Sequence, residues 1–195
     1  MVPWHFLTDY GDSAVTLPLA AAVLAVLVLG DARLLLRGWL LAVVACGSSL
    51  VLLKVGFSDC ADGGAAGRAF SPSGHTAMSA LVYGGLALLA CTGRARAVRA
   101  LALGLALVAV LAIGASRVVV HAHTVLEVGV GLGIGLGALW LLQRSTRGAE
   151  LRPSVPALLG AAALVVLVMH GARWPVEPML QRLGLLLHRS LPICT

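Results

Sequence analysis

Long apolar runs alternate with short polar, arginine-containing stretches along the whole chain. Six of the runs are about long enough for a helix to cross the ~30 Å hydrocarbon core of a bilayer. A segment that crosses lipid is expected to be a helix, because a helix satisfies its own backbone hydrogen bonds. They occupy residues 14–30, 38–53, 73–92, 98–115, 124–142 and 155–170. The pattern predicts an all-α polytopic membrane protein with about six transmembrane helices in one bundle.

Composition agrees with a single membrane-embedded domain over residues 1–195, because 59% of the 195 residues are hydrophobic and only 11% are charged. A soluble domain of this size would not need so much apolar sequence. The tail, residues 172–195, contains "WPVEPMLQRLGLLLHRSLP". Its Pro, Glu and Arg residues interrupt it too often for a span, so it is either an amphipathic helix at the membrane interface or a loosely packed tail.

Arginines gather on alternate connections. The connections after the first, third and fifth segments hold eight arginines against two acidic residues, whereas the opposite side holds six basic and six acidic residues. The positive-inside rule makes the arginine-rich side cytoplasmic. Both termini and the connections 54–72 and 116–123 should then face outward. The arginine-rich, alanine-rich composition is typical of bacteria, which predicts an inner-membrane protein with its outer side in the periplasm.

The net charge of +6 does not indicate a nucleic-acid partner, because no basic patch is interleaved with aromatic residues. The four cysteines lack metal-binding spacing. Cys46 and Cys91 lie in apolar runs and are expected to be small packing residues. Cys60 and Cys194 should both lie on the oxidising outer side, where a disulfide between them is an option.

The fifth segment contains "GVGLGIGLG", in which glycine recurs at every second residue. Gly129, Gly133 and Gly137 therefore share one helix face. This face is expected to pack closely against a neighbouring helix of the same chain, with homodimerisation as the alternative.

Three polar stretches are expected at the same outer face: Lys54 at the end of the second segment, "SPSGHTA" at 71–77 and "SRVVVHAHTVLE" at 116–127. In the second stretch, Ser73 and Gly74 stand at a helix start. Its unpaired N–H groups and dipole favour an anion such as phosphate. The alternative is a simple serine-capped helix.

In the third stretch, His123 and Glu127 are four residues apart and share a helix face. A carboxylate on one imidazole nitrogen fixes the tautomer and leaves the other nitrogen free to attack, unless the two form an ordinary surface pair. The planar donors of Arg117 suit phosphate oxygens. A zinc site built from His75, His121, His123 and Glu127 is disfavoured, because nearby cationic side chains would repel the metal. His121 is expected to be a bystander.

Together these stretches resemble the type-2 phosphatidic acid phosphatase superfamily of integral membrane lipid phosphatases, whose pattern is K-x6-RP, PSGH and SR-x5-H-x3-D. "PSGH" is complete at 72–75, and "SRVVVHAHTVLE" fits with Glu127 in place of Asp. The resemblance spans residues 50–137. The first motif departs from the pattern, because Lys54 is followed by Ala61 where Arg is usual. Arg68 is expected to supply the missing guanidinium.

The resemblance implies a metal-independent phosphatase without a cofactor. The residues implied to bind the phosphate are Lys54, Arg68, Ser73, Gly74 and Arg117. His123, oriented by Glu127, is implied to attack phosphorus and form a phosphohistidine, while His75 protonates the leaving group.

The implied substrates are phosphatidic acid, phosphatidylglycerol phosphate or an isoprenyl pyrophosphate, reached from the bilayer. The alternative is a non-catalytic lipid-phosphate binding protein with the same fold. The incomplete first motif favours this alternative. A transporter is disfavoured, because the polar residues gather at one face and the sequence shows no repeat.

Overall fold

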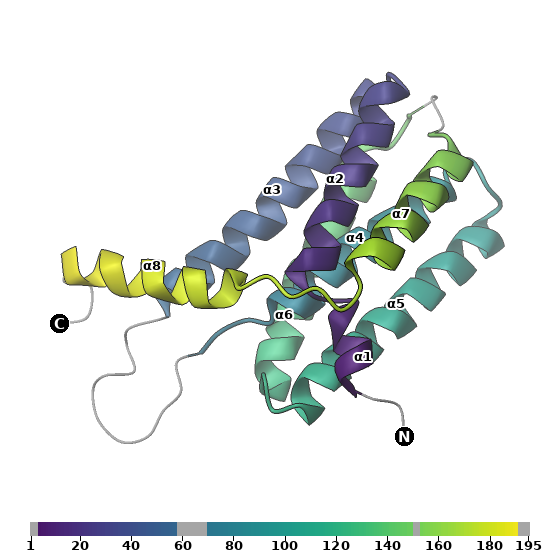
Figure 1. Cartoon of the computed structure of the whole chain (residues 1–195). Helices are drawn as coiled ribbons and strands as arrows, with labels where there is room; N and C mark the ends of the chain where they lie inside the picture. Colours follow the sequence, from purple (N-terminus) through teal and green to yellow (C-terminus); the bar gives the residue numbers. More distant parts are fainter. Residues whose placement is uncertain (1–3, 58–69, 150–152, 191–195) are drawn as a thin grey trace.

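The computed structural model describes residues 4–57, 70–149 and 153–190, and its regular elements within these ranges are α-helices (Figure 1). In chain order they are α1 (Trp4–Asp9), α2 (Ser13–Leu29), α3 (Arg33–Gly56), α4 (Gly74–Ala90), α5 (Arg96–Val119), α6 (Val125–Ser145), α7 (Val155–Met169) and α8 (Val176–Ser190). Each of the six predicted segments is one helix, from α2 to α7, so the predicted all-α bundle is confirmed.

Four stretches are long and apolar enough to cross a membrane: Trp4–Leu29, Arg33–Gly56, Arg96–Val119 and Val125–Ser145. The helices α4 and α7 are apolar but shorter. At 1.5 Å per residue, the 17 residues of α4 extend about 26 Å, slightly less than a hydrocarbon core. The chain is therefore a helical membrane protein whose apolar helices differ in length.

The helix α4 lies at the centre of the bundle and contacts α2, α3, α5, α6 and α7. Small residues make this possible. A Cβ atom on Gly85 would lie 2.5 Å from the ring of Trp39 in α3. The indole of Trp39 is itself buried and donates a 3.1 Å hydrogen bond to the carbonyl of Ala20 in α2. A side chain at position 85 would therefore displace the buried indole.

Two glycines set the approach of α6 to α4. A Cβ on Gly131 would lie 2.4 Å from the carbonyl oxygen of Ser73, and one on Gly135 would lie 2.4 Å from that of Ala77. Because neither contact leaves room for a side chain, only glycine allows the two helices to lie this close.

The prediction that the Gly129, Gly133 and Gly137 face packs closely against a neighbouring helix of the same chain is therefore wrong, whereas homodimerisation through this face stays a prediction. A Cβ on Gly129, Gly133 or Gly137 would meet no atom within 4 Å, and the last two line a hollow between α3 and α6. Helical periodicity groups glycines correctly, but it does not tell which of two glycine faces meets the neighbouring helix.

The two ends of the bundle differ in character (Figure 1). The end of α2, the start of α3, the α4–α5 connection and the end of α6 lie at one end, and most arginines of the predicted cytoplasmic side stand there, in the first turns of α3 and α5 or close by. At the other end lie α1, the start of α4, the α5–α6 connection and α8, which runs across the bundle. The tail thus forms a helix that packs mainly on α3. Its place at a membrane surface stays a prediction.

Gly131→Ala should destabilise the protein by about 1–3 kcal/mol, the usual cost of inserting a methyl group into a packed core. The physical reason is the 2.4 Å approach to the Ser73 carbonyl. Gly129→Ala is the matched control, since its Cβ meets open space. Thermal unfolding in detergent measures the difference. Equal melting temperatures for the two variants would contradict the proposed packing of α6 on α4.

Candidate active site

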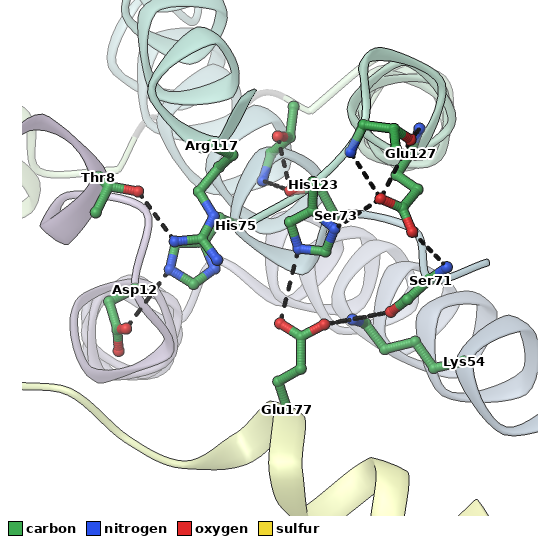
Figure 2. A network of polar contacts seen from close by, with 12 residues as sticks. Thr8, Asp12, Lys54, Ser71, Ser73, His75, Arg117, His123, Glu127 and Glu177 are labelled. Carbon is green, nitrogen blue, oxygen red and sulfur yellow. Dashed lines mark hydrogen bonds and ion pairs between the residues drawn. The ribbon is translucent and has the colours of Figure 1, made fainter. Parts of the chain in front are cut away.

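The predicted polar residues of the described ranges meet at the end of the bundle that carries α1 and α8 (Figure 2). Lys54 comes from the last turn of α3, and Ser73 and His75 come from the start of α4. His123 stands in the α5–α6 connection, and Glu127 lies in the first turn of α6. Four different elements thus supply one polar cluster.

The start of α4 is built as an anion site would be. Ser73 is the N-cap, and its hydroxyl accepts a 3.4 Å hydrogen bond from the backbone N–H of Thr76. The N–H of Ser73 donates to the carbonyl of Glu127 at 3.0 Å, which ties α4 to α6. Gly74 follows, and a Cβ there would lie 3.9 Å from Cε of Lys54. The first N–H groups of α4 and the lysine therefore border the same space.

A tight turn after α5 places His123. His121 adopts a left-handed conformation with φ of +55°, and its side chain is exposed. The chain then folds back, so that the N–H groups of Ala122 and His123 both donate to the carbonyl of Arg117, at 3.0 and 3.1 Å. The backbone of the histidine is thereby fixed against the last turn of α5.

His123 is fully enclosed, with a side-chain exposure of 0%. Its Nδ1 lies 3.4 Å from Oε2 of Glu127, and its Nε2 lies 3.7 Å from Oε2 of Glu177. Within the described ranges neither ring nitrogen has a hydrogen bond of good geometry. Because neither carboxylate contact is a well-formed hydrogen bond, the imidazole of His123 can replace one of them by a contact with another group.

Glu127 does more than face the histidine. Its Oε1 accepts from the N–H of Ser71 at 2.8 Å, and its Oε2 accepts from the N–H of Thr124 at 2.7 Å. In return the Thr124 hydroxyl accepts from the N–H of Glu127 at 3.2 Å, which completes a capping box. This motif uses Glu or Gln at its third helical position. The departure from the usual Asp thus has a local structural reason.

Arg117, from the last turn of α5, extends toward the side of the site that holds His75 (Figure 2). Its Nη1 donates to the hydroxyl of Thr8 in α1 at 3.2 Å. The short helix α1 therefore closes this side of the cluster.

Asp12 is a neighbour of the site that the sequence motifs did not indicate. It does cap α2, since Oδ1 accepts from the N–H of Ala14 at 2.8 Å. Its Oδ2, however, lies 3.5 Å from Nε2 of His75. Gly11 permits this approach, because a Cβ there would lie 2.6 Å from Cγ2 of Ile113. No local pattern in the sequence signals the contact.

Glu177, in the first turn of α8, is the second residue that sequence reasoning missed. Its Oε1 lies 2.6 Å from Nζ of Lys54 and 3.2 Å from the hydroxyl of Ser71. Together with the 3.7 Å approach to His123, the carboxylate bridges the lysine and the histidine (Figure 2). Acidic residues are common near the start of an amphipathic helix, so the place of Glu177 in the sequence does not indicate its contacts with Lys54 and His123.

A cavity of about 210 Å³ adjoins the cluster. Lys54, Gly74, His75 and Glu177 line its polar end. Its apolar wall comes from α2, α3, α4, α8 and the chain leading into α8, and includes Leu17, Leu50, Val51, Met78, Trp174 and Leu180. The polar cluster thus opens directly onto an apolar space.

Arg68, expected to replace the missing arginine, lies outside the described residues, as do Cys60 and Cys194. Cys46 and Cys91 are buried and free, as expected for packing residues. In the ranges that the structure covers, no group of three or more His, Cys, Asp or Glu side chains is arranged to hold a metal ion.

The fold and the cluster define a helical membrane protein with lysine, arginine, histidine and carboxylate side chains gathered at one end of its bundle. A family model of the PAP2 superfamily matches residues 42–150, more than half of the chain. The chain therefore belongs to the PAP2 superfamily, whose members are phosphatases, and this membership supports a phosphoester hydrolase in general. Neither curated proteins nor solved structures gave a match.

Glu127→Gln should lower the free energy of unfolding by about 1–3 kcal/mol. One of the two backbone N–H groups that donate to the carboxylate would then face the amide NH₂, which is also a donor. Asp31→Asn is the matched acid-to-amide control, expected to change stability by less than about 0.5 kcal/mol because the ion pair of Asp31 with Arg33 is exposed. Thermal unfolding of both variants in detergent checks the difference. A Glu127→Gln protein as stable as Asp31→Asn would refute the structural role of the carboxylate.

Proposed function

We propose that the protein is a metal-independent phosphatase of membrane lipid phosphates or isoprenyl pyrophosphates. It works through a phosphohistidine at the outer face of a bacterial inner membrane. The observation that carries the proposal is the enclosed His123, whose Nδ1 faces Glu127 at 3.4 Å while Nε2 faces the space beside Lys54. This is the arrangement of an oriented nucleophile.

In the first step, Lys54, Arg117 and the N–H groups at the start of α4 bind the phosphoryl oxygens and offset their charge. Glu127 holds the proton of His123 on Nδ1, so Nε2 attacks phosphorus. The bond between phosphorus and the lipid oxygen breaks, and that oxygen takes a proton from His75. The products are the lipid alcohol, or lipid monophosphate, and a phosphohistidine.

In the second step, water attacks the phosphohistidine and gives its proton to His75, now the base. The bond between phosphorus and Nε2 breaks. Inorganic phosphate leaves, and both histidines return to their starting protonation states. The cycle uses groups of this chain and one water molecule.

Two features support a lipid substrate. The cluster lies at one end of the helical bundle, where headgroups would meet it, and the adjoining cavity has a largely apolar wall. A hydrocarbon chain next to the phosphate would gain about 0.8 kcal/mol per buried methylene group. The arginine-rich connections at the opposite end support an outward-facing site by the positive-inside rule.

His123→Asn should lower phosphate release from lipid phosphates by at least about 1,000-fold, since the nucleophile is lost. The measurement is inorganic phosphate release by the purified protein in detergent, from phosphatidic acid, phosphatidylglycerol phosphate and an isoprenyl pyrophosphate. Wild-type release should be unchanged in EDTA.

The control for that measurement is His121→Asn, which alters an exposed imidazole two residues away. It should keep wild-type activity. Loss of wild-type release in EDTA would contradict the metal-independent mechanism. A folded wild-type protein that releases phosphate from no substrate of the panel would instead favour a lipid-phosphate binding protein.

Asp12 has a role in the same proposal as the positioning residue of His75. With Oδ2 at Nε2, it directs the opposite ring nitrogen toward the leaving oxygen and offsets the charge of the ring as an acid. The site then holds two carboxylate–imidazole pairs, one for the nucleophile and one for the acid.

Asp12→Asn should lower kcat for a long-chain alkyl phosphate by about tenfold or more, because a poor leaving group needs a well-placed acid. The asparagine keeps the cap of α2. Turnover of p-nitrophenyl phosphate, whose leaving group needs no proton, should change less than about threefold. Equal losses for the two substrates would reduce Asp12 to its capping role.

A further inference from the structure

The space where the proposed mechanism places the substrate phosphate is filled by a carboxylate of the chain itself. One oxygen of Glu177 contacts Lys54 and Ser71, at 2.6 and 3.2 Å, and the other lies 3.7 Å from Nε2 of His123. A phosphoryl group attacked by His123 and held by Lys54 must contact the same two atoms. Two anions cannot share this space, so one excludes the other.

This ion pair is not an ordinary surface contact. The side chain of Lys54 is only 7% exposed, and that of Glu177 is 30% exposed. An exposed pair contributes little to stability, whereas a partly enclosed lysine needs a counter-charge at all times. Glu177 supplies that charge while the site holds no phosphate.

Burial alone would raise the pKa of Glu177, but its polar contact with His123 and the charge of Lys54 outweigh burial and hold this pKa well below its usual range. When the pKa of a carboxyl group is depressed in the folded protein, its ion pair is fully present at any pH above the ordinary pKa of the group. The ion pair is lost only as the pH falls through the depressed pKa. Within the described ranges Lys54, His123 and Ser71 contact the carboxylate, and His75 is close enough to interact with its charge. Mild acidification therefore does not break the contact.

The helix that carries Glu177 is attached to the bundle on one side only. It packs mainly on α3, and its approach is held by the N–H of Trp174, which donates to Asp12 at 3.3 Å. Large apolar side chains of α8 point outward, with Met179 63% and Leu186 64% exposed. Among the described residues α8 thus packs chiefly on a single helix, and a helix attached in this way can lift without disturbing the core.

We propose that Glu177 is an internal competitor for the phosphoryl site and that α8 is the cover that carries it. This rests on the proposed function. Substrate binds only in the fraction of molecules whose α8 has lifted, so the apparent dissociation constant equals the intrinsic one divided by that fraction. The phosphate of the substrate then replaces the carboxylate on Lys54.

The test uses the full chain in detergent and the variant Glu177→Gln, which keeps the shape of the side chain but removes its charge. KM for phosphatidic acid and Ki for inorganic phosphate should both fall by about tenfold or more, while kcat stays within about threefold. Arg182→Gln, which removes an exposed charge from the same helix, should leave both constants unchanged. Glu177→Ala should act in the same direction as Glu177→Gln.

Unchanged KM and Ki in both Glu177 variants would overturn the proposal. A large loss of kcat would also overturn it, because Glu177 would then take part in the chemistry. Calorimetric titration with inorganic phosphate separates this result from a failure of the phosphatase function. Tighter phosphate binding by Glu177→Gln in a protein that hydrolyses nothing would support the competitor and refute the enzyme.

Discussion

The carboxylate of Glu127 is the interaction on which the candidate site depends. It accepts hydrogen bonds from the backbone of Ser71 and of Thr124 and faces His123, while its own backbone carbonyl accepts from the N–H of Ser73. One residue thereby connects the start of α4, the start of α6 and the imidazole between them. Hydrogen bonds to a charged group contribute about 1.5–3 kcal/mol each, so this residue organises the site as well as facing its histidine.

The packing of the helices creates the conditions for that interaction. Gly131 and Gly135 let α6 lie directly against the backbone of α4, which brings the first turns of both helices to the same level. Trp39 and the small residues of α4 fill the centre below. The polar groups are therefore confined to one end of the bundle, where both an aqueous phase and the apolar cavity adjoin them.

The site combines residues inside and outside the region that the family model matches. Lys54, His75, Arg117, His123 and Glu127 all lie within residues 42–150. The two carboxylates that contact this machinery from outside that region, those of residues 12 and 177, come from the start of α2 and from α8. Charge balance explains their presence, since an enclosed cluster of cationic and imidazole groups is stable only beside counter-charges. Elements outside the matched region thus set the electrostatics of the matched one.

The sequence by itself determined the number and place of the spanning helices, because apolar runs and backbone hydrogen bonding in lipid leave no other choice. It also placed Ser73, His75, His123 and Glu127 in short motifs whose spacing is local. Only the tertiary structure decided which glycine face of α6 meets α4 and which acids face the two histidines. Asp12 and Glu177 reach the site across 63 and 123 residues of chain, to His75 and Lys54 respectively. Such contacts arise from helix packing, for which no periodicity or motif within a single segment carries a signal.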